Sequence, residues 1–445
     1  MPSRTPWFFS WFPALLVAPL AAQRATPVVE RQIVAAGVWA EARYNYAYWD
    51  AVHANWDSAF AATVTFIGER PAPTDLQFFR RLRRWGALLN DGQLAILPPV
   101  ALAGRMARPP LSVRSIERRP FIIDYATNDE MRIARPERLA EILAVQGIPA
   151  AIWIRDSVLP EIPAATEAGR WERAVARMLE GERGTALHLL LRLPGGEERG
   201  ASVTRSVALT ARWPLERPAL EADTLADGAI WIRVNSLADD GVLERFDRAL
   251  GDVAREGPRH RGLILDLRET VWTPSGREHG YAILSRLIDR PFLTSRWRTP
   301  QYRPAYRGSD TPDSTGAWLA APPDTIWPPS RRERIAYTGP VAVLVSARTA
   351  GAAEDFLVAF RGGNRGPIIG ESSAGSTGQT AMLSLAGAWQ LRVTVTRDAF
   401  PDGKEFVRTG IAADYPVEVR VEDVLSGRDA ALDRARAYLA ETARR

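Results

Sequence analysis

Residues 341–360 read VAVLVSARTAGAAEDFLVAF, and they give the clearest indication of the fold. Val341–Val345 is a short apolar run typical of a buried strand, and a helix is expected from about Ala352 to Phe360. The turn between them places Gly351 against the free N–H groups and the positive dipole end of a helix. An oxyanion formed there would be stabilised. A glycine also serves a tight turn, which is the simpler interpretation of the motif taken alone.

The same alternation of strand and helix extends on both sides of this unit, from about residue 217 to the C-terminus. Buried strands that alternate with helices indicate α/β layering. The stretch 300–329 is rich in Pro, Gly, Ser, Thr and Asp, which predicts a long surface loop or lid. The expected strands are 230–234, 262–267, 341–345, 367–370, 381–385 and 391–396, and the expected helices are 242–254, 281–288, 352–360 and 429–442.

The first half of the chain has a different pattern. Residues 28–89 carry apolar side chains at helical spacing, and Thr74 with Gln77 forms a capping box. Residues 101–213 contain strand-like runs, one helix and a hairpin, which predicts a small α+β module. We therefore predict a signal peptide at 1–22, a helical domain at 27–100, the module at 101–213 and an α/β domain at 217–445.

Composition limits the function classes. The net charge is +5 over 445 residues, the only lysine is Lys404, and no basic stripe interleaved with aromatics occurs, so we expect no nucleic-acid partner. The chain has no cysteine and four scattered histidines, so we expect neither a metal nor a cofactor.

The N-terminus predicts export. Arg4 precedes a short apolar stretch from Trp7 to Leu20 that ends at Ala21-Ala22, as in a secretory signal peptide. The mature protein is then secreted or periplasmic. The alternative is an uncleaved anchor, which would be the only contact with a membrane.

Several segments together resemble the tail-specific, or C-terminal processing, serine protease family, including its tricorn-core and interphotoreceptor-retinoid-binding-like branch. The family turn T-A-S-A-A-E resembles residues 349–354, and its strand ending in D-L-R resembles 262–268. Further similar segments are LLNDGQL at 88–94, IWIRVNSL at 230–237, IGESSAGSTGQ at 369–379, PDGKEFVRTGIAADYPV at 401–417 and VLSGRDAALDRARAYL at 424–439. The resemblance implies a PDZ-like module at 101–213 and a ClpP/crotonase-like α/β domain at 217–445.

The resemblance also implies which positions carry chemistry, and here the sequence departs from the family. The nucleophile position is Gly351, the base position is Gln93, and Ser376 stands where the processing branch has a catalytic lysine. The oxyanion region corresponds to Thr270, Trp272 and Ala352, and the cleft is expected to be lined by Glu371, Ser372 and Ser373.

Three hypotheses follow from these departures. Glycine cannot form an acyl-enzyme and glutamine cannot accept a proton near neutral pH, which favours an inactive peptidase with a retained cleft for a peptide, a protein segment or an apolar ligand. An active endopeptidase with a displaced nucleophile at Ser372, Ser373 or Ser376 is the second hypothesis. A non-enzymatic binding or scaffold protein is the third.

Overall fold

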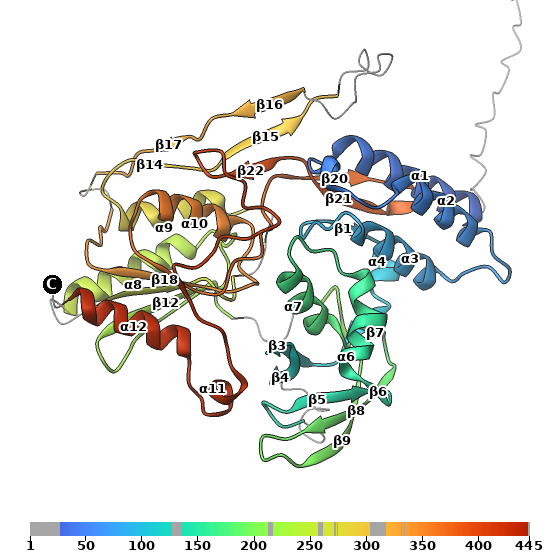
Figure 1. Ribbon diagram of the computed structural model, residues 1–445, viewed down its shortest axis with the longest axis horizontal. Coiled ribbons are helices and arrows are strands. Elements are labelled where there is room, and N and C mark those ends of the chain that lie inside the picture. Colours follow the sequence, from blue (N-terminus) through green and yellow to red (C-terminus); the bar gives the residue numbers. More distant parts are fainter. Residues whose placement is uncertain are drawn as a thin grey trace, which may run out of the picture.

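A computed structural model describes residues 27–126, 136–211, 217–256, 261–270, 273, 275–302, 317–330, 332 and 334–443, except the side chains of 252–256. The predicted signal peptide and Trp272 lie outside these residues. Figure 1 shows three regions: N-terminal helices, a second sheet with its own helices, and a larger sheet with helices on both faces. The multidomain α/β architecture expected from the sequence is confirmed.

The central sheet has the strand order β11-β12-β13-β18-β19-β23. All neighbours run parallel except β11, which is antiparallel to β12. The expected strands at 230–234, 262–267, 341–345 and 367–370 are confirmed within one or two residues. The strands are β11 (Leu220–Thr224), β12 (Ala229–Val234), β13 (Gly262–Asp266), β18 (Val341–Val345), β19 (Ile368–Gly370) and β23 (Tyr415–Pro416).

Helices cover both faces of this sheet because its central strands are apolar on both sides. Leu263 and Val341 belong to the large core that includes Phe246 and Phe356, while Ile264 belongs to a second core with Leu439. Alternate residues of one strand thus serve opposite layers. The helices are α8 (Val242–Glu256), α9 (Arg277–Leu287) and α10 (Ala352–Gly362) on one side and α12 (Ala430–Thr442) on the other, with α11 (Val421–Leu425) before α12.

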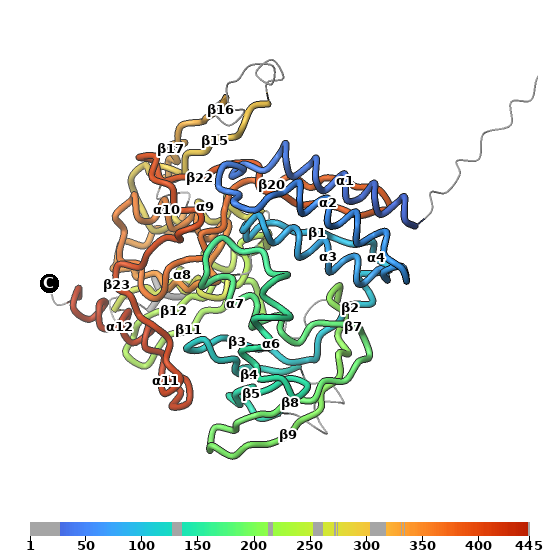
Figure 2. Tube along the Cα trace, turned by 45° about the vertical axis from the view of Figure 1, so that its right-hand side comes forward, coloured from blue at the N-terminus to red at the C-terminus, as the bar shows by residue number. Residues whose placement is uncertain are grey.

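The second sheet belongs to the expected α+β module and has the order β3-β4-β5-β8-β9, with β6 paired to β5. A separate apolar core fills it. In Figures 1 and 2 its helix α7 lies on the side that faces the rest of the chain. The elements are β3 (Leu111–Ile116), β4 (Arg119–Tyr125), β5 (Glu141–Val145), β6 (Ile148–Pro149), α6 (Ala150–Trp153), η2 (Ile154–Val158), η3 (Leu159–Glu161), α7 (Glu167–Arg177), β8 (Ala186–Arg192) and β9 (Glu198–Thr204). A smaller sheet beside it contains β2 (Met106–Arg108), β7 (Gly181–Glu182) and β10 (Val207–Ala208).

The N-terminal helices share a core with a segment about three hundred residues further along the chain. The Phe78 and Trp389 rings are 5.4 Å apart, and β1 pairs with β21, so the blue helices and orange strands of Figure 1 lie side by side. The capping box of Thr74 and Gln77 is confirmed. The elements are α1 (Pro27–Asn45), η1 (Trp49–Ala51), α2 (Trp56–Ile67), α3 (Asp75–Ala87), β1 (Ala95–Leu97), α4 (Val100–Ala103), β20 (Thr380–Ser384), η6 (Ala386–Ala388) and β21 (Gln390–Thr394).

The predicted loop or lid at 300–329 is wrong for its described part. Residues 318–321 and 325–326 form strands because they pair with β15 and β14, a long-range contact that the polar composition does not reveal. The strands concerned are β14 (Phe292–Leu293), β15 (Arg296–Pro300), β16 (Trp318–Ala321), β17 (Thr325–Ile326) and β22 (Arg397–Ala399).

Candidate functional site

The turn between β18 and α10 is fastened to the end of β13. The Thr349 hydroxyl donates to the Leu267 carbonyl at 2.9 Å and accepts the Ser346 N–H at 3.0 Å. The Ser346 hydroxyl donates to the Arg268 carbonyl at 2.9 Å. The carboxyl ends of neighbouring parallel strands, where α/β proteins bind ligands, are therefore held in a fixed geometry.

Gly351 stands at the N-cap of α10 with φ 62° and ψ −128°. Residues other than glycine are strained at such a positive φ. Its N–H donates to the Ser376 carbonyl at 2.9 Å, and its carbonyl accepts the Glu354 N–H at 2.8 Å. The position thus offers neither a side chain nor a free N–H.

Gln93, at the expected base position, is a buried structural link. Its side-chain amide donates to the Gly378 carbonyl at 3.1 Å and to the Thr394 hydroxyl at 3.3 Å. Its backbone carbonyl accepts the Arg392 Nε–H at 2.8 Å. A neutral amide held by these bonds cannot act as a general base.

Ser376 connects the two positions. Its carbonyl accepts the Gly351 N–H, while a Cβ built on Gly92 would lie only 2.3 Å from its hydroxyl oxygen. Its side chain is buried and its hydroxyl has no hydrogen-bond partner among the described residues. The loop 371–379, which includes Ser376, therefore contacts both the Gly351 turn and the 92–93 segment.

The loop 371–379 is anchored by Glu354. This fully buried carboxylate accepts the Ser373 hydroxyl, the Gly375 N–H at 2.7 Å and the Ser376 N–H at 2.8 Å. Burial raises the pKa of Glu354 to about 7, although these hydrogen bonds oppose the shift. Ser373 also accepts the Ile411 N–H at 2.7 Å, so its hydroxyl is fully engaged and buried.

The remaining expected site residues differ in their surroundings. Thr270 is buried and donates to the Val234 carbonyl at 2.7 Å, so its hydroxyl points to β12. Ala352 is buried at the start of α10. Glu371 accepts the Ala347 N–H at 3.3 Å, and Ser372 is exposed.

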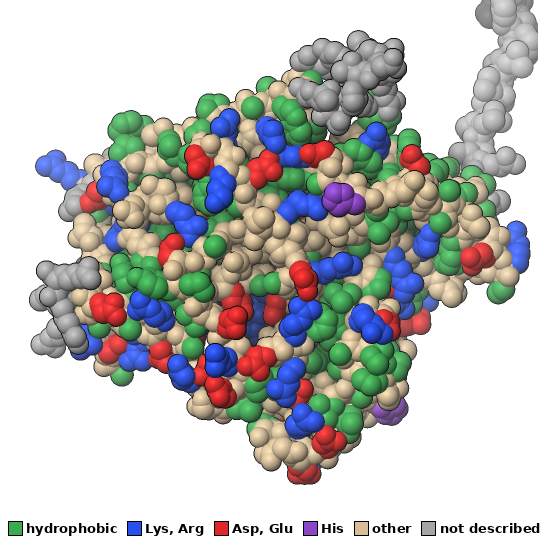
Figure 3. Space-filling model, viewed as in Figure 1, with side chains coloured by type: hydrophobic (Ala, Val, Ile, Leu, Met, Phe, Trp, Pro, Cys, Tyr) green, Lys and Arg blue, Asp and Glu red, His purple; other side chains and the backbone are tan. Residues whose placement is uncertain are grey.

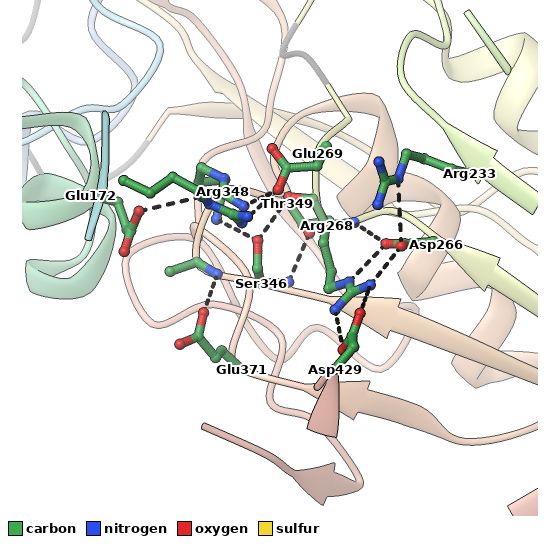
Figure 4. A network of polar contacts seen from close by, with 12 residues as sticks. Glu172, Arg233, Asp266, Arg268, Glu269, Ser346, Arg348, Thr349, Glu371 and Asp429 are labelled. Carbon is green, nitrogen blue, oxygen red and sulfur yellow. Dashed lines mark hydrogen bonds and ion pairs between the residues drawn. The ribbon is translucent and has the colours of Figure 1, made fainter. Parts of the chain in front are cut away.

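Sequence reasoning missed an ion-pair network that joins the module to this turn (Figure 4). Arg348 pairs with Glu269 and, at 3.5 Å, with Glu172 of α7, while Arg114 of β3 also pairs with Glu269. Figure 3 shows charged side chains gathered around a hollow in the middle of the face that it displays. No spacing along the sequence brings these four residues together, because they belong to distant elements.

One carboxyl group of this network, that of Glu172, has a strongly shifted pKa. Burial raises the pKa of Glu172 to about 8, helped by the nearby carboxylates of Glu371 and Glu269. Arg114 and the Ser115 N–H oppose this shift. The folded chain therefore favours the protonated form of Glu172 more than an exposed site would.

We predict that the folded chain loses stability as pH rises from about 5 to 8. Glu172, Glu354 and Asp398 have folded pKa values of about 8, 7 and 7. Over this range the folded state binds more protons than the unfolded state, so the free energy of unfolding falls with increasing pH. Thermal unfolding at several pH values measures this directly.

The Glu172→Gln variant should show a flatter pH dependence, whereas the Glu197→Gln variant, at an exposed site, should follow the native curve. A melting temperature that rises between pH 5 and pH 8 would contradict the assignment of these shifts.

Two further observations concern the described ranges alone. They contain no group of three or more His, Cys, Asp or Glu residues able to hold a metal ion. Within the same ranges, no helix has both the length and the hydropathy that crossing a bilayer requires.

The layered sheet, with its strand–turn–helix unit at Gly351 and the loop 371–379 packed against it, defines an α/β fold. Comparison with known proteins makes the class specific: the sequence model of Peptidase family S41 matches residues 230–417. This part of the chain is thus similar to Peptidase family S41.

Individual relatives agree with this placement. The chain is 24% identical over 369 residues to carboxyl-terminal-processing peptidase 2, chloroplastic, of Arabidopsis thaliana, covering 82% of this chain and 65% of that protein. Mature CPAF, with and without bound lactacystin, has a similar fold, with TM-scores of 0.70 at 15% identity. The match with the lactacystin complex covers 93% of this chain and 97% of that one.

Proposed function

We propose that this chain is a peptidase-family protein without peptidase activity that retains a cleft for an extended peptide. The observation that carries the proposal is the surroundings of Gly351. The loop 371–379 contacts both Gly351 and Gln93, and these two residues supply neither a nucleophile nor a base, which supports the proposal. Acyl transfer needs a nucleophile activated by a base.

The displaced-nucleophile alternative has less support. The Ser373 hydroxyl already donates to Glu354 and accepts from Ile411. Ser376 is buried against Gly92, and within the described residues its hydroxyl has no basic hydrogen-bond partner. Ser376 is the more interesting of the two because its hydroxyl is unpartnered in the described part of the chain.

The retained function is peptide binding by the PDZ-like module. Strand β3 is at one end of its sheet, and α7 packs beside it. A peptide can add to such an edge through main-chain hydrogen bonds. This role needs no catalytic serine. We also propose that the N-terminal segment directs the chain out of the cytoplasm, as expected for the predicted signal peptide.

Incubation of the purified chain with casein tests the lack of activity. We expect no fragments above background, and the same result for variants with alanine at 372, 373 and 376. Cleavage by the native chain that one of these alanine variants abolishes would instead establish a displaced nucleophile.

We predict that Gly351→Ser alone restores little cleavage. The serine would gain a hydroxyl at the right turn, but Gln93 would still provide no base, and loss of one triad member typically costs 10³-fold or more in rate. The strained backbone also costs about 1–3 kcal/mol for a non-glycine residue. Casein cleavage together with a thermal melt measures both effects.

The double variant Gly351→Ser/Gln93→His is the matched comparison. Faster cleavage by the double than by the single variant would identify the base as the next missing group. Substantial cleavage by Gly351→Ser alone would show that another residue already serves as the base, against the proposal.

A further inference from the structure

Helix α3 carries arginines at positions 80, 81, 83 and 84. Arg83 and Arg84 lie three and four residues after Arg80, so these three side chains share one side of the helix. Like charges at such spacings destabilise a helix. Figure 3 shows basic side chains gathered over α3, which is labelled in Figure 1. A bound anion would offset the repulsion between them.

The three arginines converge on one carboxylate, that of Glu161 in η3. Arg80 Nε and Arg84 Nε contact the same oxygen, Glu161 Oε1, at 2.7 and 3.4 Å. Arg83 Nε lies 3.6 Å from the other oxygen, Oε2. Because one carboxylate meets all three guanidinium groups, these groups are close neighbours in space. Glu161 supplies one negative charge against their three positive charges, so two positive charges remain unmatched.

Glu180, a second carboxylate near this cluster, does not remove the excess. It lies 3.9 Å from Arg83, but it already accepts two hydrogen bonds from Arg177 Nε, at 3.1 and 3.0 Å. Burial lowers the pKa of Arg108, and the charge of Arg177 lowers it further, although Glu180 opposes the shift. Glu180 is thus shared among several arginines and cannot neutralise those of α3.

The other charged neighbours leave the excess in place. Burial lowers the pKa of Arg205, and the charge of Arg80 lowers it further. Within the described residues, Arg205 has no carboxylate partner and donates to a backbone carbonyl and a threonine hydroxyl. Asp156 is paired with its neighbour Arg155 at 2.6 Å. The surroundings of the three α3 arginines are therefore positive on balance.

Arg83 is a nearly buried positive charge without a strong partner. Its side chain is 11% exposed, and it donates no hydrogen bond to another described residue. Burial, with the charges of Arg177 and Arg80, lowers the pKa of Arg83 to about 10, although Glu180 and Glu161 oppose the shift. At that pKa the guanidinium still carries its charge at neutral pH. A buried charge of this kind is stabilised when an anion binds nearby.

Arg80 and Arg84 make the cluster accessible to a ligand. Their side chains are 44% and 49% exposed. Arg84 donates no hydrogen bond to another described residue, so its five N–H donors are available. The fork of a guanidinium group matches the oxygens of a phosphate, and hydrogen bonds between two charged groups are the strong ones. A phosphate dianion also matches the two unmatched positive charges.

We propose that the side of α3 formed by Arg80, Arg83 and Arg84 binds a phosphate group. Arg80 and Arg84 donate hydrogen bonds to the phosphate oxygens from the solvent side, and Arg83 adds positive charge from beneath. The site uses none of the residues at the Gly351 turn, so it is independent of whether the chain is a peptidase.

Titration calorimetry with inorganic pyrophosphate on the purified full chain tests the proposal. Saturable binding is expected, and Arg84→Gln should weaken it about tenfold because a charged hydrogen-bond donor is lost. The double variant Arg80→Gln/Arg84→Gln should weaken it about a hundredfold. Arg199→Gln/Arg248→Gln is the matched control, since it removes the same charge at two exposed arginines, and it should bind within about twofold of the native chain.

Glu161→Gln gives a change in the opposite direction. It removes the negative charge beside the bound phosphate and keeps an acceptor oxygen for Arg80, so pyrophosphate should bind about fivefold or more tightly. A purely structural role of the arginines would produce no such gain. If a thermal melt shows that Glu161→Gln does not fold, Arg84→Gln decides, because it leaves the hydrogen bond between Arg80 and Glu161 in place.

A second arm distinguishes a soluble phosphate from a lipid headgroup. The chain is sedimented with phosphatidylcholine vesicles that contain phosphatidate. Binding of free pyrophosphate supports a soluble ligand, and binding to the vesicles alone, lost in Arg80→Gln/Arg84→Gln, supports a headgroup. The proposal is overturned if neither probe binds at millimolar phosphate, or if Arg199→Gln/Arg248→Gln loses as much binding as Arg80→Gln/Arg84→Gln.

Discussion

Replacing Arg277 by leucine should lower the free energy of unfolding by about 3–5 kcal/mol at pH 8. Arg277 donates to Asp355 and to Asp398, in each case at 2.9 Å, and both carboxylates are almost completely buried. Without the guanidinium, two buried negative charges face each other with no countercharge. Urea unfolding measures the loss.

The loss should be smaller at pH 5. Burial raises the pKa of both carboxyl groups, that of Asp398 to about 7, and they protonate more readily still once Arg277 is gone. Adding Asp355→Asn and Asp398→Asn should recover part of the stability at pH 8. Arg248→Leu, at an exposed pair with Glu244, should change stability by no more than about 0.5 kcal/mol. An Arg277→Leu variant as stable as this control would contradict the account.

Replacing Glu354 by alanine should lower the free energy of unfolding by about 3 kcal/mol or more. The change leaves the Ser373 hydroxyl and the N–H groups of Gly375 and Ser376 without their acceptor, and each unsatisfied buried donor costs about 1–3 kcal/mol. Because these donors hold the loop 371–379, limited proteolysis should also cut within the loop faster than in the native chain.

Glu354→Gln and Glu422→Ala are the matched controls. The Glu354→Gln variant keeps one acceptor oxygen and should lose less stability than the Glu354→Ala variant. Glu422 is exposed on α11, so Glu422→Ala should hardly change the free energy of unfolding. The account would be contradicted if the Glu354→Ala variant had the same urea midpoint as the native chain and its loop 371–379 were cut no faster. The Glu354 carboxylate would then not anchor the loop.

Much of the α/β region follows from local sequence. Apolar runs such as Val341–Val345 are buried on both faces, and the helices after them carry apolar stripes, so strand and helix order is readable from periodicity. The glycine at position 351 also predicts the tight turn, because only glycine adopts the positive φ of this position without strain.

The buried ion pairs could not be predicted from periodicity. Arg277 lies 78 residues from Asp355 and 121 from Asp398, and Arg348 meets Glu172 only because α7 packs against the turn. The pairing of β15 with β16 likewise depends on contacts across sheets. Such contacts arise from the assembled fold, and no spacing rule encodes them.

The fold also changes the interpretation of Gly351 as a simple turn glycine. Its N–H is bonded to Ser376, and Ser376 is pressed against the segment that carries Gln93. These contacts support the proposal that the three positions belong to one site.

Intact-protein mass spectrometry of the native chain after treatment with a fluorophosphonate probe tests the central claim most directly. The reagent modifies an activated serine irrespective of which position holds it. We predict that the mass stays unchanged while an active serine peptidase in the same tube is labelled. Stoichiometric modification of this chain at any serine would contradict the claim that it has no peptidase nucleophile.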